Sequence, residues 1–335
     1  MTGTGERLIA LLADPAGPGP GLPRDPPGNE ELLRLLPQAE LHGVLPVFLA
    51  NLRAAWPGVE PGAALQSANR RLVERSAMIM FLTAESRRVV RALDRAGVPA
   101  VILKGAEFAA RLYAAPAQRT FGDMDILVPV ADEARAAEVL SADGYRERID
   151  AMKYGSGYGQ RAFEHPTVPG AEVELHTNLV NSPTLRRGVS AEFRDVPLER
   201  GPGGGVRPTA AGLLLIACIH GATSHGFDKL QHLCDVALAA RGAAGPVDAS
   251  ELLVAIDRTG AGMCVGWGLD LAGRTLGCHA CERLLAQLEI SWPRAAARWL
   301  MPPDLVSRAQ GPRRRAGSWR RQALRQLLKR RRSRS

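Results

Sequence analysis

The sequence predicts an α+β protein in which a small mixed sheet lies between two helical regions. Apolar residues recur at helical spacing before residue 96 and again from 210 to about 300, whereas three short runs between 98 and 176 have the β-branched or alternating pattern of strands. The chain has 335 residues, of which 46% are hydrophobic and 23% charged, so it can bury a sizeable core in an ordinary globular fold.

The N-terminal region, residues 1–90, is expected to be helical. Residues 14–29 are dense in Pro and Gly, which predicts a loop. Leucines at helical spacing from 30 to 52 predict helical structure that is broken at Pro37. A longer helix is predicted at 63–96, because a glycine directly after it is a typical helix stop.

Residues 91–207 are expected to form the core that holds the sheet. The predicted elements, in order, are a strand at 98–103, a helix at 106–114, a strand at 124–128, a helix at 132–142 with Asp132 as its N-cap, and a strand at 172–176. The last strand alternates Glu, Val, Glu, Leu and His, so its three polar side chains share one face of the sheet.

Residues 208–306 are expected to form a helical C-terminal region, followed by a basic tail at 307–335. The tail contains twelve Lys and Arg and no acid, which leaves 31 basic against 34 acidic residues in the rest of the chain. Runs of like charge favour disorder. Contact with an anionic membrane surface, a nucleic acid or an acidic partner remains open for this tail.

The cysteines and the apolar runs bear on the compartment. Five cysteines are an odd number, and the first residues lack the basic segment and long apolar run of a secretory signal. We therefore expect reduced thiols and a cytoplasmic protein. No window approaches the 18 or more apolar residues of a membrane span, so a transmembrane segment is not expected.

Paired carboxylates are the strongest chemical feature of the sequence. Asp123 and Asp125 are separated by one residue on a predicted strand, so both side chains point to the same side. Carboxylate oxygens are the ligands that Mg²⁺ prefers, and Glu174 on another strand is the candidate for a third ligand. The alternative interpretation is a solvated strand end.

Several short motifs, taken in their order and spacing over about residues 30–240, resemble those of a bacterial family of poorly characterised nucleotidyltransferases in the polymerase-β-like superfamily. The residues that carry the resemblance are Val101-Ile102-Leu103-Lys104-Gly105, Tyr113, Pro116, Arg119, Asp123-Met124-Asp125-Ile126-Leu127-Val128, Glu174-Leu175-His176, and His220, His225, Lys229, Leu233 and Asp235.

The resemblance implies a polymerase-β-like fold, with a small mixed sheet and flanking helices. It also implies that Asp123 and Asp125 bind Mg²⁺ (or Mn²⁺) and the nucleotide phosphates. Glu174 would be the third catalytic and metal-binding carboxylate, placed to draw off the proton of the attacking hydroxyl. His176 and His220 match family positions and are expected to bind nucleotide.

One departure from the superfamily concerns the end of the first strand. Lys104-Gly105-Ala106 stands where the superfamily has Gly-Ser or Gly-Gly, so the hydroxyl that grips phosphate is missing. Gly105 still permits close backbone approach. Lys104 is one of only four lysines against 39 arginines, which favours a specific role as a phosphate cation. Arg119 is expected either to contact phosphate or to neutralise the acidic pair.

Two other clusters invite a zinc interpretation. The first is made of His220, His225, His232 and Asp235. His220 and His225 are five residues apart, and on a straight α-helix they do not share a face. A structural role, with His220 facing the catalytic cleft, is therefore favoured over a metal site. Cys278 and Cys281 form a lone Cys-x-x-Cys pair, whereas a structural zinc needs four ligands.

The function expected from the resemblance is a Mg²⁺-dependent transfer of a nucleoside monophosphate from an NTP to an acceptor. The acceptor is open and includes a natural product, a sugar phosphate or a protein. The alternative is a non-catalytic protein on the same fold that binds a nucleotide or a partner.

Overall fold

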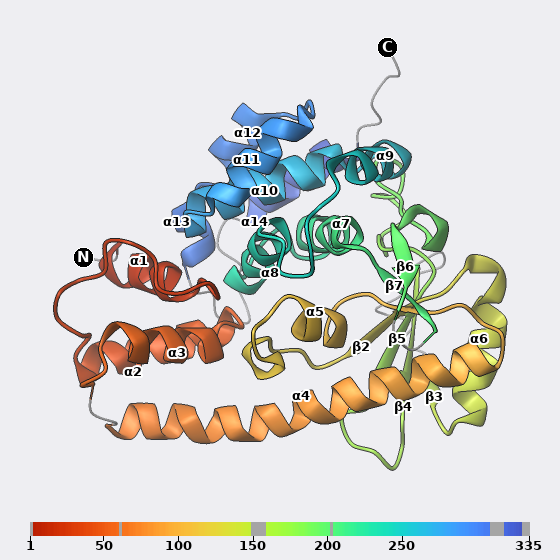
Figure 1. Ribbon diagram of the computed structural model, residues 1–335, viewed down its shortest axis with the longest axis horizontal. Helices are drawn as coiled ribbons and strands as arrows, with labels where there is room; N and C mark the ends of the chain where they lie inside the picture. Colours follow the sequence, from red (N-terminus) through yellow and green to blue (C-terminus); the bar gives the residue numbers. More distant parts are fainter. Residues whose placement is uncertain (1–2, 60–61, 149–158, 202–203, 309–317, 330–335) are drawn as a thin grey trace.

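One mixed sheet of five short strands forms the centre of the α/β part of the chain (Figure 1). The computed structural model describes residues 3–59, 62–148, 159–201, 204–308 and 318–329. The strands are β1 (Val101–Ile102), β2 (Met124–Leu127), β3 (Arg146–Arg148), β4 (Gln160–Glu164) and β5 (Glu172–His176), in the order β1-β2-β5-β4-β3. Only β2 and β5 run parallel, and the other neighbours are antiparallel. A separate hairpin pairs β6 (Leu198–Arg200) with β7 (Val206–Pro208).

The two faces of the sheet differ in polarity because side chains alternate along each strand. Met124 and Ile126 of β2 lie in one apolar cluster with Val173 and Leu175 of β5, beneath the helices α4 (Ala63–Arg95) and α6 (Glu133–Ala142). The intervening residues, among them Asp125, point to the opposite face. The alternation predicted for the strand at 172–176 is confirmed, and it places a polar surface on the side away from α4.

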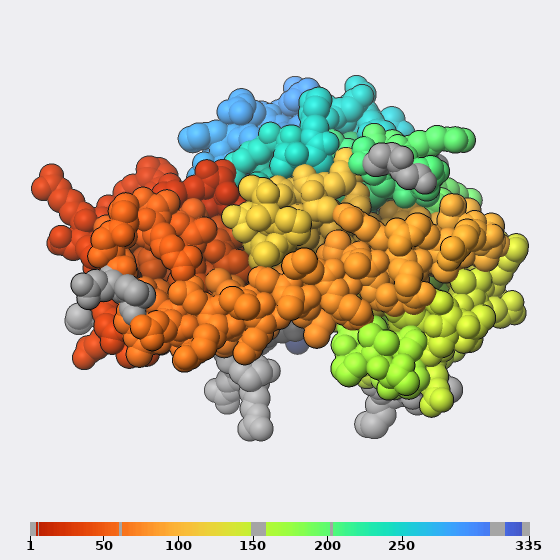
Figure 2. Space-filling model, turned by 60° about the horizontal axis from the view of Figure 1, so that its bottom comes forward, coloured from red at the N-terminus to blue at the C-terminus, as the bar shows by residue number. Residues whose placement is uncertain are grey.

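The longest helix, α4, connects the N-terminal helices to the sheet. It has 33 residues and so extends about 50 Å. One end of α4 packs against the N-terminal helices and the other end packs against the apolar face of the sheet. Figure 2 shows its outer face running across one side of the protein. The helix stops at Gly97, whose φ of 73° is left-handed and whose N–H bonds Asp94 while that of Val98 bonds Leu93. The helix predicted at 63–96 is confirmed.

Three shorter helices precede α4, namely α1 (Gly3–Leu12), α2 (Asn29–Leu41) and α3 (Leu45–Ala55). The loop predicted at 14–29 is confirmed, but the break predicted at Pro37 is wrong, because Pro37 lies inside α2. Pro37 is on the exposed side of that helix, where water can hydrate the carbonyl that a proline leaves unbonded. The chain instead turns at Gly43, whose φ is 71°.

The C-terminal helices cover the side of the molecule opposite α4 (Figure 1). They are α7 (Ala210–His220), the π-helical turn η4 (Gly221–His225), α8 (Leu230–Ala240), α9 (Ala249–Thr259), α10 (Gly262–Leu276), α11 (His279–Leu288), α12 (Arg294–Leu300) and α13 (Pro303–Ser307). The helical character predicted from 210 to 300 is confirmed. The short helix α5 (Ala106–Arg111) follows β1 and lies between the two helical layers.

The expectation of a disordered tail is wrong for residues 318–328, which form the helix α14 (Ser318–Leu328). Leu324 and Leu328 are buried, and Arg321 donates a hydrogen bond from Nε to the carbonyl of Gly226 at 3.1 Å. Burying a leucine contributes about 1.5–3 kcal/mol, whereas salt screens repulsion among exposed arginines beyond about 8 Å. Apolar docking therefore outweighs like-charge repulsion here. Residues 309–317 and 330–335 of the tail lie outside the described part.

All five cysteines are buried free thiols. Neither Cys278 nor Cys281 belongs to a metal-ligand cluster in the described part of the chain. Among the residues that the structure describes, no helix combines the length and the apolar character needed to cross a membrane.

Candidate active site

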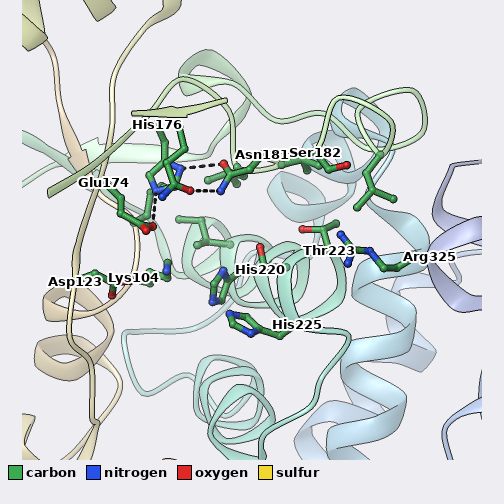
Figure 3. A pocket seen from close by; sticks show the side chains of 17 residues that line it. Lys104, Asp123, Glu174, His176, Asn181, Ser182, His220, Thr223, His225 and Arg325 are labelled. Carbon is green, nitrogen blue, oxygen red and sulfur yellow. Dashed lines mark hydrogen bonds and ion pairs between the residues drawn. The ribbon is translucent and has the colours of Figure 1, made fainter. Parts of the chain in front are cut away.

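A cavity of about 350 Å³ lies between the polar face of the sheet and the C-terminal helices. One wall comes from the sheet and the segment after β5, and we call it the sheet wall. The other comes from α7, η4 and α14, and we call it the helical wall. Figure 3 shows Asp123, Lys104 and Glu174 at one end and Arg325 at the other. The lining residues are Leu103, Lys104, Asp123, Gln160, Glu174, His176, Leu179, Val180, Asn181, Ser182, Leu185, Ile216, His220, Thr223, Ser224, His225 and Arg325.

The three predicted carboxylates come together on the sheet wall. Asp125 and Glu174 are directly paired across the parallel strands β2 and β5, so their side chains lie on the same face. Asp123, two residues before Asp125, lines the cavity with Glu174. The negative charge of Asp125, together with burial and Glu174, raises the pKa of Asp123 to about 6. Like charges are therefore held close together, which is the arrangement of a cation site.

Asp125 is the most deeply buried of the three, with a side chain that is 0% exposed. Its Oδ1 forms an ion pair with Lys104 Nζ at 2.8 Å and a hydrogen bond with His176 Nε2 at 3.0 Å. Burial alone would raise the pKa of Asp125, but these two positive partners outweigh it and hold the pKa below its ordinary value. The second oxygen, Oδ2, is buried and has no hydrogen-bond partner among the described residues.

His176 connects the carboxylates to an outer layer of polar side chains. Its Nδ1 lies 3.1 Å from Asn181 Oδ1, and Asn181 in turn donates to Gln160 Oε1 at 2.5 Å. Its Nε2 is also 3.7 Å from Glu174 Oε2. Burial would lower the pKa of His176, but its hydrogen bonds to Asp125 and Glu174 raise the pKa to about 9. The ring is therefore an imidazolium at neutral pH and is fixed in orientation.

The donor set fits a divalent cation. One ligand atom each of Asp125, Glu174 and His176 lie within 4.8 Å of one another. Because the imidazolium of His176 has no lone pair for a metal, the atoms available to a cation are the carboxylate oxygens, among them the unsatisfied Oδ2 of Asp125. Carboxylate oxygens suit Mg²⁺ and Mn²⁺. The predicted metal ligands were Asp123, Asp125 and Glu174, without His176. In the structure both Asp123 and His176 line the cavity.

Lys104 and Gly105 follow β1, as predicted, but only Lys104 lines the cavity. Lys104 keeps its charge, since the pull of Asp125 and its neighbours outweighs burial and raises its pKa. Gly105 has a φ of 51°, and a Cβ there would meet the Phe121 ring at 3.1 Å and the carbonyl of Asp123 at 3.4 Å. The glycine is thus required by the loop that leads into β2, and no phosphate is needed to explain it.

The expectation that Arg119 contacts phosphate in the cavity is corrected by its position. Arg119 is 4% exposed and does not line the cavity. Its Nε and Nη2 each donate to a carboxylate oxygen of Asp235 at 2.9 Å, and Tyr113 donates to the same carboxylate at 2.8 Å. The guanidinium of Arg119 is therefore engaged in a bidentate ion pair with Asp235, which links the loop before β2 to α8. Three motif residues therefore form a structural cluster behind the site.

The helical wall contains His220 and His225, whose ring centroids are 4.7 Å apart. The expectation that a five-residue spacing separates them is wrong, because η4 is a π-helical turn that bonds residue i to i+5. Gly221 permits this turn, since a Cβ there would clash with the ring of Phe227. Burial holds the pKa of His220 well below its ordinary value, so this imidazole is neutral, in contrast to that of His176.

Six polar lining residues were not predicted from the sequence, namely Gln160, Asn181, Ser182, Thr223, Ser224 and Arg325. Arg325 comes from α14 and reaches the cavity from the end opposite Asp123 (Figure 3). The signal for it was present in the tail: Arg321, Leu324, Arg325 and Leu328 follow the i, i+3, i+4, i+7 spacing of one helix face.

The comparisons with known proteins agree with the position of these motifs. A protein-family model described as an uncharacterised nucleotidyltransferase matches residues 29–277, well over half of the chain. Searches of the curated proteins and of the solved structures gave no match. The matched range contains β1, β2, β5, α7 and α8, and with them all the predicted site residues. The chain therefore belongs to this family of uncharacterised nucleotidyltransferases.

Proposed function

We propose that this protein has a polymerase-β-like core and transfers a nucleoside monophosphate from an NTP to an acceptor, with Mg²⁺ or Mn²⁺ bound at Asp123, Asp125 and Glu174. The observation that carries the proposal is the register of β2 and β5, which sets Asp125 beside Glu174 at the end of a cavity that Asp123 also lines. Membership of a nucleotidyltransferase family supports the same reaction class.

The metal, when bound, neutralises charge on the transferred phosphate and lowers the pKa of the attacking hydroxyl. The residues of the chain position the reactants. Glu174 lines the cavity and has a side chain that is 17% exposed, against 0% for Asp125, so it rather than Asp125 can accept the proton of an acceptor hydroxyl. Lys104 pairs with Asp125 in the structure, and its flexible side chain can turn to a phosphate oxygen when a metal ion takes its place.

The acceptor is proposed to bind toward the end lined by Ser182, Thr223 and Arg325. The triphosphate and its metal require the carboxylates, which occupy the other end of the cavity. The remaining lining includes the hydroxyls of Ser182, Thr223 and Ser224 and the guanidinium of Arg325, which suits a polar acceptor that carries an anionic group. A sugar phosphate, a carboxylate-bearing natural product and an acidic protein segment all have this chemistry.

Calorimetry with α,β-methylene analogues of the four NTPs tests the proposal. We expect one analogue or more to bind in the presence of Mg²⁺ and not with EDTA. Asp123→Asn should abolish the Mg²⁺-dependent binding, whereas Asp94→Asn, on the exposed side of α4, should leave it unchanged. Binding that is indifferent to Mg²⁺ or to Asp123→Asn would overturn the proposed site.

A second measurement separates transfer from non-catalytic binding. An NTP labelled at the α-phosphate is incubated with the protein and a cell extract, and labelled products are resolved by chromatography. Transfer predicts a new labelled product that requires Asp123. Nucleotide binding without such a product would favour the non-catalytic alternative.

A further inference from the structure

Three histidines that the proposed reaction does not use lie together, two of them in the helical wall and the third on the neighbouring helix α8. His220 ends α7, His225 ends η4, and His232 is on α8. The nearest ligand nitrogens of the three rings are all within 4.8 Å of one another. The ring centroid of His232 is 5.7 Å from that of His220 and 4.4 Å from that of His225. Three imidazoles from three elements thus converge at one point.

The backbone holds two of these rings in place. In η4 the N–H of Gly226 bonds the carbonyl of Gly221, and this i to i+5 bond brings His220 and His225 to the same side. Gly226 has a φ of 59°, and its carbonyl accepts the hydrogen bond from Arg321 of α14. π-Helical turns are rare and occur often at functional sites. The turn therefore builds a pair of adjacent imidazoles that a regular α-helix would separate.

A buried carboxylate accompanies the cluster. Asp228 has a side chain that is 8% exposed, and its Oδ1 lies 3.6 Å from His225 Nδ1 and 3.7 Å from His232 Nδ1. These separations exceed a hydrogen bond by about half an ångström. His232 Nδ1 is buried and has no hydrogen-bond partner in the described part of the chain. A carboxylate that orients the far nitrogen of a histidine is the usual neighbour of a metal-bound imidazole.

We propose that His220, His225 and His232 bind a second divalent cation, of the borderline type to which Zn²⁺ and Co²⁺ belong, at a site separate from the carboxylates. Imidazole nitrogen suits these ions better than it suits Mg²⁺. Three protein ligands leave one tetrahedral position open, as in catalytic zinc sites. His220 and His225 line the cavity, so the open position faces the substrate space.

This site goes beyond the proposed nucleotidyl transfer and does not depend on it. A cation held by three imidazoles would present a bound water, or a hydroxyl of the acceptor, to the cavity with a lowered pKa. Asp228 would supply one negative charge beside it. The ligand separations must shorten to about 3.3 Å for metal–nitrogen bonds of about 2.0–2.1 Å, which small rotations of the three rings can supply.

Cobalt spectroscopy on the full-length protein tests the inference. The protein is stripped with a chelator, dialysed, and titrated with Co²⁺ in excess Mg²⁺, which fills the carboxylate site. We expect one equivalent of Co²⁺ to give the intense visible bands of a four-coordinate ion, and Zn²⁺ to displace it. The absence of such bands in the wild-type protein would overturn the proposal.

Variants assign the ion to the histidines. His225→Gln, whose side chain is 30% exposed, and His232→Gln should each weaken Co²⁺ binding at least about 100-fold while circular dichroism shows a folded chain. His279→Gln, with a side chain 81% exposed on α11, is the matched control and should leave the bands unchanged. Bands that survive His225→Gln but vanish in Asp123→Asn would place the ion at the carboxylates and refute the site.

Discussion

The two walls of the cavity differ in how their buried ionisable groups are stabilised. On the sheet wall, Asp125 is in contact with both Lys104 and His176, so buried charges are held in pairs. On the helical wall His220 is kept neutral, and so is its neighbour His232 on α8, because burial lowers the pKa of both. Arg325 has no ion pair among the described residues. The sheet wall thus holds buried charges that compensate one another, whereas among the described residues the helical wall presents a neutral imidazole and the guanidinium of Arg325.

This difference follows from how each wall is built. The pleat of β2 and β5 sets alternate side chains on one face and brings unlike charges within contact distance. The helical wall depends on an irregular turn, η4, and on α14, which begins 93 residues after η4 ends, so its groups share no periodic spacing in the sequence. Mutations should therefore affect stability mainly through the sheet wall and ligand binding through both.

The largest effect is expected from breaking the charge pair on the sheet wall. Asp125→Ala leaves the ammonium of Lys104 buried without its partner, which costs about 3–5 kcal/mol in the free energy of unfolding. Urea denaturation in EDTA measures the loss. The double variant Lys104→Met, Asp125→Ala should recover part of it, because the ammonium is then gone, whereas His176 still lacks its contact with Asp125. A single-variant loss below about 1 kcal/mol would show that the pair is already well solvated.

The second effect sharpens the assignment of the metal. Glu174→Gln should weaken Mn²⁺ binding about 100-fold, or about 2.7 kcal/mol, because a carboxylate ligand becomes a neutral amide. Glu172→Gln is the matched control: Glu172 shares the same face of β5, does not line the cavity, and contacts Arg148 at 3.1 Å. Electron paramagnetic resonance of free Mn²⁺ gives both affinities. Equal losses in the two variants would mean that the general charge of β5, and not a ligand, attracts the ion.

The third effect compares the two walls by protonation state. In metal-free protein, His176 should remain an imidazolium through pH 8, whereas His220 should be neutral at pH 6. Two-dimensional ¹⁵N spectra of the histidine rings distinguish the forms. Because the folded pKa of His176 is raised to about 9, its contribution to stability is full below pH 6.5 and is lost as pH rises through 9.

That loss should amount to about 2 kcal/mol between pH 7 and pH 9. His176→Gln removes the titrating group, so the difference in unfolding free energy between wild type and variant should shrink over this range. A constant difference would show that His176 is neutral in the folded protein and that the contact with Asp125 is an ordinary hydrogen bond.

The contrast between the walls also explains how far the sequence could predict the site. Asp123, Asp125 and Glu174 could be predicted because side chains along a strand alternate between the two faces of the sheet with a period of two residues. His225 was misjudged because a spacing of five is meaningful only if a π-turn forms, and that turn depends on Gly221 admitting the ring of Phe227. Tertiary packing, which local spacing does not encode, decides such a turn.

Charge was the other source of error. Arg119 was expected at the cavity because it lies near Asp123 in sequence, but Asp235, over a hundred residues away, captures its guanidinium. The tail was expected to be disordered because it is a run of like charges. Leu324 and Leu328 nevertheless find an apolar surface on the body of the protein. In both cases a partner distant in sequence determined the outcome.

The smallest effect tests whether the helical wall contributes charge at all. Arg325→Ala should weaken binding of inorganic pyrophosphate about tenfold, or about 1.4 kcal/mol, since it removes a guanidinium that lines the cavity. Stability should change little, because Leu324, Leu328 and Arg321 still anchor α14. Arg320→Ala is the matched control, because Arg320 lies on the same helix between Trp299 and Trp319 and away from the cavity lining. If both variants lose affinity equally, pyrophosphate responds to the net charge of α14. If neither does, the anion is held by the cations of the sheet wall, Lys104 and His176, and the guanidinium of Arg325 adds nothing to its binding.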